Sequence, residues 1–416
     1  MASAPPEAVG PAHVGVVSFL AARAAPTGGF WIALAGGVAL ARVAERCGAR
    51  LGFGASAAAM LETVAIIGPA RFGVPLTQAL SAPMLGRLHA RGAGFWPQLL
   101  ACALVRLLHN AATTAFFIWV IAGGLDAYAG TYDALGRRVG LEVGTADALV
   151  LTLAGLLAWA AFASTVQVLV YGHGLRMWAS TPAVASGQAA PGSEGGTALD
   201  RPVAPDRRFD PRAVALAALV AFVLLLASTE WELLAAVALW LVFASLVSRA
   251  EPTPLRAGLA FAAVLAGGAF VFALGGGLGL DTALRRASRA GLLVLAATWL
   301  RAAAGAAGLR EVSRRALGRL RSVPSATEAA AILDTIASEG RLTAAGRALA
   351  ARLSASAKRP RALVEAVLTW VIREAETMGA AAPPAAGMLA RRPLRLCVAD
   401  WTLMGSALLP AAALMP

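Results

Sequence analysis

The sequence predicts an all-α fold, a polytopic integral membrane helical bundle in two halves with a cytoplasmic amphipathic helical module. Of its 416 residues, 58% are hydrophobic and only 14% are charged, whereas about 25% of residues are charged in soluble domains. Several apolar runs approach the roughly 20 residues that a helix needs to cross a bilayer. A stretch rich in Gly, Ser, Pro and Ala at 179–206 is typical of a flexible linker and separates these runs into two groups.

The strong positive charge indicates a surface beside anionic lipids. The formal net charge is +13, and in a membrane protein basic residues concentrate on the cytoplasmic face. We therefore expect anionic lipids and no nucleic acid among the partners. The three cysteines, Cys47, Cys102 and Cys397, lie far apart, and their spacing predicts neither a metal site nor a cofactor.

The first half of the chain is expected to hold four spans. Residues 1–26 are predicted to be a loose N-terminal arm, without the positive segment of a signal peptide, and residues 27–178 the N-terminal membrane half. Residues 68–94 contain three prolines in their first sixteen positions and predict a cytoplasmic or re-entrant elbow. The candidate spans are Gly28–Ala41, Leu51–Ile67, Phe95–Ile121 and Ala148–Val170.

Residues 207–307 form the predicted C-terminal membrane half. The chain becomes most basic after Ala302, which the positive-inside rule assigns to the cytoplasm. With the first half, this predicts about eight to ten spans in the inner (cytoplasmic) membrane. The apolar runs of this half are Ala213–Ala227, Trp231–Val247, Leu255–Leu274 and Ala287–Leu300.

Residues 308–393 are predicted to form a basic cytoplasmic module. They carry 14 basic and 7 acidic side chains, a net charge of 14 − 7 = +7. Ser325-Ala326-Thr327-Glu328 has the pattern of a capping box and predicts a helix that continues to Ala337. Apolar residues between Leu363 and Ile372 recur on one helical face. Residues 394–416 are expected to form a final membrane helix.

Five short segments in the second half follow a recognisable order. Phe209-Asp210-Pro211-Arg212 precedes the first apolar run, and Ser228-Thr229-Glu230 joins the first two runs as a tight hairpin. The third run ends at Gly275-Gly276-Gly277-Leu278-Gly279, and Ala283-Leu284-Arg285-Arg286-Ala287 leads into the fourth. Gly308-Leu309-Arg310-Glu311-Val312 then opens a basic helix.

This order, over residues 207–335, resembles the transmembrane coupling subunit of energy-coupling-factor (ECF) importers, the family that includes the cobalt-uptake CbiQ proteins. The resemblance implies an ABC importer in which separate ATPase subunits move cytoplasmic coupling helices. The coupling subunit passes that motion to a substrate-binding membrane subunit. The family's coupling helices carry Ala-Arg-Gly-type motifs; residues 301–378 contain none, and Ala90-Arg91-Gly92 is the one literal match.

Four polar residues within apolar runs are candidate ligand-binding residues. Glu62 is costly in lipid, so it should face a cavity or a partner; an ion pair with Arg106 or a place near a helix end would also explain it. Arg106, His109 and Asn110 share one helical face. They are expected either to line a polar pocket for an anionic or metal-bearing ligand or to lie where the span leaves the cytoplasm. Tyr171 is expected to be an interfacial tyrosine.

Arginines at helical spacing after the fourth run are candidate partner-docking residues. They are expected either to contact acidic grooves of an ATPase or to lie against lipid head groups. The chain has no P-loop and no hydrolase motif, so a transport permease is expected rather than an enzyme. The alternatives are an integral-membrane lipid-modifying enzyme and a non-catalytic membrane scaffold or assembly factor. The candidate docking residues are Arg310, Arg314, Arg315 and Arg319.

Overall fold

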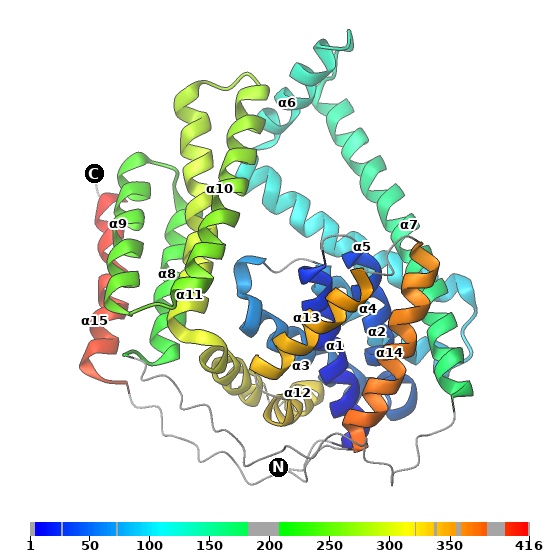
Figure 1. Ribbon diagram of the computed structural model, residues 1–416. Coiled ribbons are helices and arrows are strands. Elements are labelled where there is room, and N and C mark those ends of the chain that lie inside the picture. The colour runs from blue at the N-terminus through cyan, green and yellow to red at the C-terminus, as the bar shows by residue number, and fades with distance from the viewer. Residues whose placement is uncertain are drawn as a thin grey trace.

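The computed structural model describes residues 5–25, 28–71, 74–181, 208–320, 322–336, 339–354, 359–380 and 396–414. All secondary structure in this part of the chain is helical (Figure 1). The elements are α1 (Pro6–Ala24), α2 (Gly29–Cys47), α3 (Ala49–Ile67), η1 (Pro69–Arg71), α4 (Val74–Ala90), α5 (Phe95–Phe116), η2 (Phe117–Ala122), α6 (Leu125–Arg137), α7 (Thr145–Ser180), α8 (Pro211–Ala227), α9 (Trp231–Val247), α10 (Pro252–Gly275), α11 (Leu280–Arg319), α12 (Pro324–Thr335), α13 (Glu339–Ser354), α14 (Pro360–Ala380), α15 (Val398–Ser406) and η3 (Leu409–Leu414).

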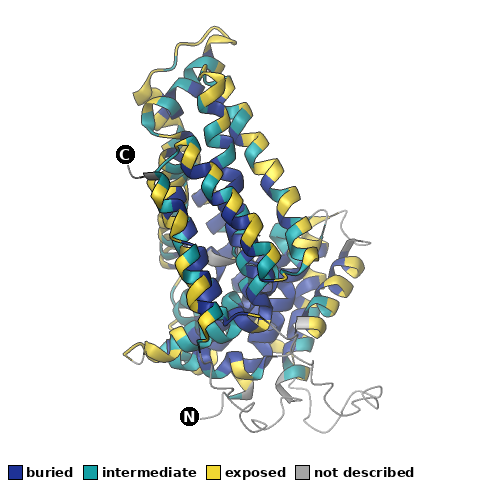
Figure 2. Ribbon diagram, turned by 90° about the vertical axis from the view of Figure 1, so that its left-hand side faces the viewer, coloured by how far each residue is buried: buried dark blue, intermediate teal, exposed yellow. Residues whose placement is uncertain are grey.

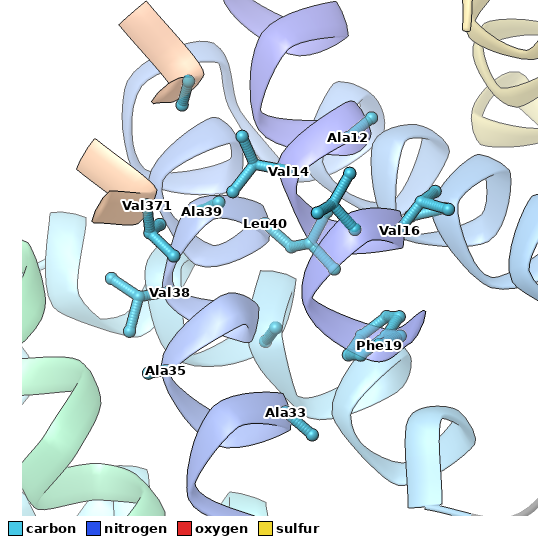
Figure 3. Packing of buried hydrophobic residues seen from close by; sticks show 14 of the residues in the cluster. Ala12, Val14, Val16, Phe19, Ala33, Ala35, Val38, Ala39, Leu40 and Val371 are labelled. Atoms are coloured by element: carbon cyan, nitrogen blue, oxygen red, sulfur yellow. The ribbon is translucent and has the colours of Figure 1, made fainter. Parts of the chain in front are cut away.

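A helical lobe forms around α1. The helix is surrounded by α2, α3, α13 and α14, and its apolar side chains are almost fully buried. Figure 3 shows Val14 and Phe19 of α1 packed with Leu40 of α2, and Val371 of α14 close to the same core. Because α1 is apolar and buried on all sides, it behaves as the central helix of a core.

The C-terminal helices α12, α13 and α14 complete this lobe. The apolar stripe of α14 is buried as its spacing predicts, with Leu363, Val367, Leu368 and Val371 inside the core that α1 and α2 build. The outward face of α13 and α14 is basic. Its exposed arginines are Arg341, Arg347, Arg352, Arg359, Arg361 and Arg373.

Five described helices are long and apolar enough to cross a membrane, which is compatible with a membrane protein: α3, α5 with η2, α7, α10 and α11. In α5, α7 and α10 only 17–22% of the most apolar window is buried within the chain, and Figure 2 shows exposed residues along the long helices. A soluble protein does not leave this much apolar surface exposed. By contrast, 78% of the most apolar window of α11 and 56% of that of α3 are buried, so these stretches lie inside the assembly.

The two groups of helices meet at both ends of the molecule. At one end, η2 and α6 pack against α10, where Tyr128 and Phe272 belong to a small apolar cluster (Figure 1). At the other end, α11 packs against α3 and α12. The helix α11 is therefore in contact with the lobe and with the exposed bundle of α8, α9 and α10.

Two sequence expectations for the first ninety residues are wrong. Residues 1–26 do not form a loose arm, since most of them belong to α1. Residues 68–94 are largely the helix α4 rather than an elbow. Pro6 lies at the start of α1, where the missing N–H removes no helical hydrogen bond. Both helices also continue through an internal proline, Pro11 in α1 and Pro83 in α4, so proline does not end the helix at either place.

The expected spans at the two ends of the chain also differ from the structure. The predicted span Gly28–Ala41 lies in α2, where twelve of nineteen residues are buried, so α2 is a core helix. The predicted final span over residues 395–414 contains α15, which has nine residues and is too short to cross a bilayer. The prediction of eight to ten spans counted both segments. The predicted capping box is wrong too, because α12 begins at Pro324 and Ser325 lies inside it.

We predict that His13 makes the lobe sensitive to acid. Burial in α1, and then the charge of Arg341, lower the pKa of His13 from 6.5 to about 4. The unfolded chain therefore binds a proton below about pH 6.5 while the folded lobe does not, so stability falls as the pH drops from 6.5 toward 4. The shift corresponds to a loss of about 3 kcal/mol by pH 4.

Thermal unfolding in detergent between pH 7 and pH 4 measures this effect. His13→Gln should show a smaller loss than the unmodified chain, whereas His173→Gln, at an exposed position, should leave the pH dependence unchanged. Equal pH profiles for all three proteins would contradict the prediction.

Candidate functional site

The first of two buried polar centres joins α3 to α11. Glu62 of α3 is fully buried and forms a bidentate ion pair with Arg310 of α11. Its Oε2 atom lies 2.6 Å from the Arg310 Nε atom. A buried carboxylate is stable only when it is paired and hydrogen-bonded, so this pair fixes the approach of the two helices.

A second arginine of α11 bonds to the same helix. The Arg301 Nε atom donates to the backbone oxygen of Ile66 at 2.8 Å, and Arg301 is buried. Glu62 and Ile66 are four residues apart, so both bonds use one face of α3. Between the two arginines, α11 is kinked at Gly305, whose φ of 60° and ψ of 169° interrupt the helix. We call Glu62, Ile66, Arg301 and Arg310 the α3 clamp.

Arg289 ties α11 to the exposed bundle. It is buried, and its guanidinium donates to the carbonyl oxygens of Leu225 and Leu226 at 2.7 and 3.0 Å. These carbonyls lie in the last turn of α8, where a positive charge and extra donors are favourable. Arg289, which precedes Gly305 by about four turns, thus holds α8 to α11.

The Phe209-Asp210-Pro211-Arg212 segment forms the start of α8. Asp210 is the N-cap, and its side chain accepts from the backbone N–H and guanidinium of Arg212. Burial alone would raise the pKa of Asp210, but these Arg212 bonds outweigh it and hold the pKa below its usual value. The Asp210 N–H donates to Asp400 of α15 at 2.7 Å. The segment therefore has a structural role in this chain.

The second buried polar centre lies where α4, α5 and α7 meet. Arg106 of α5 donates from Nη2 to the Oε1 atom of Gln167 at 2.7 Å. The Gln167 Nε2 atom donates to Ser81 of α4 at 2.7 Å, and the Cys102 thiol lies 3.3 Å from the same Gln167 oxygen. All four side chains are buried.

Several polar atoms around this centre have no hydrogen-bond partner among the described residues. On α5 they are Arg106 Nε and Asn110 Nδ2, on α7 they are Ser164 Oγ and Tyr171 Oη, and on α4 it is Gln78 Oε1. Ser164 lies close to the Cys102 thiol, and Tyr171 lies close to the Gln167 side chain. We call the eight residues the Arg106 cluster: Gln78, Ser81, Cys102, Arg106, Asn110, Ser164, Gln167 and Tyr171.

The structure places three of the four candidate ligand residues in the two centres and His109 in neither. Glu62 is paired with Arg310, and no hydrogen bond among the described residues joins it to Arg106. Arg106 and Asn110 belong to the Arg106 cluster, one turn apart on α5. The half-buried His109 side chain makes no hydrogen bond to it in the part of the chain that the structure describes. That any of them binds a ligand stays a prediction.

The candidate docking arginines differ in their surroundings. Arg310 belongs to the α3 clamp. Arg314 and Arg315 both bond Glu311 on their own helix, and Arg314 also lies 3.5 Å from Asp334 of α12. Arg319 is exposed at the end of α11 and has no ion pair among the described residues. Arg319 is therefore the docking candidate that is most available to a partner.

The sequence analysis missed the polar face that α7 contributes. Ser164, Gln167 and Tyr171 are spaced by three and four residues inside an apolar run, which places them on one helical face. That spacing was a usable signal. Tyr171 is not interfacial as expected but buried, with its hydroxyl against Gly37 of α2, where any side chain would collide with it. Among the described residues, no group of His, Cys, Asp or Glu could hold a metal ion.

We predict that breaking the α3 clamp destabilises the fold strongly. Glu62→Gln leaves the Arg310 charge without its carboxylate, and removal of one partner from a buried ion pair costs about 3–5 kcal/mol. Denaturant or thermal unfolding in detergent measures the loss. The control is Asp133→Asn, which removes a more exposed pair with Arg137 on α6 and should cost under about 1 kcal/mol. Equal losses in the two variants would contradict the prediction.

Comparisons with protein-family models, with curated proteins and with solved structures find no match to this chain. The resemblance of residues 207–335 to ECF coupling subunits therefore stays a prediction. Within this chain, the α3 clamp and the Arg106 cluster are the two buried polar centres from which a function can be inferred.

Proposed function

We propose that this protein is a membrane transport component that passes movement of the helical lobe to the exposed bundle through α11. This is the role that the resemblance to ECF coupling subunits implies. In this proposal a separate ABC-type ATPase supplies the energy and a substrate-binding membrane unit receives the motion. The single observation that carries the proposal is the α3 clamp, which holds α11 on both sides of its kink.

The geometry of α11 suits a lever. The segment before Gly305, which begins at Leu280, rises about 37 Å at about 1.5 Å per residue and is long enough to cross a hydrocarbon core of about 30 Å. The segment after Gly305 runs beside α3 and α12 within the lobe (Figure 1). A change of the kink angle would therefore reorient one segment relative to the other.

The bonds of α11 favour transmission of such a change. Arg301 and Arg310 lie four residues before and five residues after Gly305 and both bond α3. A displacement of α3 therefore acts on both segments of α11. Arg289 lies nearer the N-terminus of α11 and holds the end of α8. Therefore α8 would move with the segment of α11 that precedes Gly305.

The lobe presents a basic surface to partners. Arg319 ends α11, and the exposed arginines of α13 and α14 lie on the same lobe. Such a surface suits acidic grooves of an ATPase and anionic lipid head groups. In this proposal Arg319 contacts the ATPase, and the arginines of α13 and α14 contact lipid in the inner membrane.

We predict that an ABC-type ATPase co-purifies with the chain in mild detergent and that Arg319→Glu reduces its recovery several-fold. Reversal of the charge places a carboxylate against an acidic groove, which weakens association. Mass spectrometry of the tagged protein from its native membrane measures the recovery. Arg138→Glu, at an exposed position beside α6, is the matched control and should recover the ATPase in full.

Two other outcomes would replace the proposal. Activity of the isolated chain on a lipid substrate without ATP would favour a lipid-modifying enzyme. A stable partner with no dependence on nucleotide would favour a scaffold or assembly factor. Absence of any ATPase from the purified complex would remove the coupling role.

We predict that Gly305→Ala impairs coupling more than assembly. A φ of 60° with a ψ of 169° lies in a region that is essentially restricted to glycine and costs a residue with a Cβ atom about 1–3 kcal/mol, so alanine should favour a straighter α11. The ATPase should still co-purify, while ATP-dependent uptake in reconstituted vesicles should fall. Gly267→Ala is the control, because its added Cβ meets open space on α10. Unchanged uptake in Gly305→Ala would contradict a role for the kink.

A further inference from the structure

We propose that the Arg106 cluster is a binding site for an oxyanion group, a carboxylate or a phosphate, held between α4, α5 and α7. The inference does not depend on the coupling role, because it uses other residues and other helices. It assigns a chemical class to a ligand of this membrane protein. Three features support it: the buried charge of Arg106, the saturated carbonyl oxygen of Gln167, and the unpaired donors near both.

The Arg106 charge has no carboxylate partner. Its side chain is 6% exposed, and no ion pair with it occurs among the described residues. A buried charge without a counter-ion is unfavourable by several kcal/mol. Buried Glu62 shows the usual solution in the same chain, since it has a bidentate ion pair. An arginine that meets only an amide oxygen within the described part of the chain therefore indicates a place for an anion that these residues do not supply.

The Gln167 carbonyl oxygen cannot accept a further hydrogen bond. Its Oε1 atom accepts from Arg106 and from the Cys102 thiol, which uses both lone pairs. Its Nε2 atom donates to Ser81, and Ser81 donates onward to the Thr77 carbonyl oxygen at 2.7 Å. Gln167 is thus held in one orientation, with its oxygen toward the guanidinium. We regard Gln167 as the residue that positions Arg106.

The unsatisfied atoms beside Arg106 are mainly donors. Arg106 Nε, Asn110 Nδ2, Ser164 Oγ and Tyr171 Oη can each donate a hydrogen bond, and none of these atoms has a partner among the described residues. Arg106 and Asn110 come from α5, and Ser164 and Tyr171 come from the face of α7 that also carries Gln167. One positive charge with several donors matches an oxyanion, whose oxygens only accept.

The chemistry of the cluster excludes a bound metal cation. Its members include no carboxylate and no histidine, and a guanidinium would repel a cation. The sequence analysis left an anionic and a metal-bearing ligand open for this helix face, and the donor set favours the anion. The oxyanion could belong to a free solute or to a lipid head group, because α5 and α7 both have surfaces exposed for lipid.

The test is anion-dependent thermal stability of the purified chain in neutral detergent at constant ionic strength. The probes are sodium acetate, sodium phosphate and phosphatidylglycerol in mixed micelles, with sodium chloride as the reference. A ligand that binds only the folded state raises the unfolding temperature with its concentration. We expect a saturable rise with at least one oxyanion. Response to the lipid alone would assign a head-group site, and response to acetate or phosphate a solute site.

Variants connect the effect to the cluster. Arg106→Gln should weaken the apparent affinity about 10- to 100-fold, because a hydrogen bond to a charged group is worth about 1.5–3 kcal/mol. Tyr171→Phe and Ser164→Ala keep the Arg106 charge and most of the packing, and each should weaken the apparent affinity several-fold. These two variants keep the test valid if Arg106→Gln does not fold. Arg138→Gln, remote and exposed, should bind like the unmodified chain. The proposal would be overturned if none of the three probes raised the unfolding temperature. It would also be overturned if the Tyr171 and Ser164 variants bound the probe with the same affinity as the unmodified chain.

Discussion

Two arginines of α11 bond one face of α3 on either side of a glycine kink, and the arrangement of the molecule depends on these bonds. Glu62 is fully buried, so it requires a cation, and Arg310 provides one from a helix 248 residues away in sequence. Arg301 bonds the carbonyl oxygen of Ile66 one turn further along α3. Together they determine where α11 leaves the exposed bundle and enters the lobe. Only Gly305 allows the sharp change of direction between them without a Cβ penalty.

The buried charges of the described chain have two kinds of surroundings. Some have partners that connect helices, and one, Arg106, has few partners and is a candidate for ligand binding. Glu62, Arg289 and Arg301 each meet an opposite charge or a set of carbonyl oxygens, so each explains a contact between helices. Within the described residues, Arg106 meets one amide oxygen and lies near several unpaired donors. The first three residues hold helices together, and Arg106 is the residue on which the proposed anion site is based. A lever and a ligand site on separate helices are compatible with transport, in which binding and motion must be connected.

Hydropathy and spacing were sufficient to predict the helical fold and most of its long helices. The run Trp231–Val247 coincides with α9, and the apolar stripe of α14 is buried as predicted. Hydropathy could not distinguish a helix surrounded by protein from one surrounded by lipid, so α2 was taken for a span. The helix α1 was missed because its Pro and Ala content was taken as typical of a loose arm. The candidate residues Glu62 and Arg106 are both buried and bonded, but their partners, Arg310 and Gln167, are distant in sequence. Such pairings depend on tertiary packing, which local patterns do not contain.

Hydrogen exchange on Glu62→Gln, read by mass spectrometry in detergent, tests most directly whether the α3 clamp connects the lobe to the bundle. Amide exchange reports local opening of each helix. If the clamp has this role, exchange should rise together in α3, in both segments of α11 around Gly305 and in the end of α8 that Arg289 holds. A rise confined to α3, with α11 and α8 unchanged, would contradict the account, because the ion pair would then be a local contact of one helix.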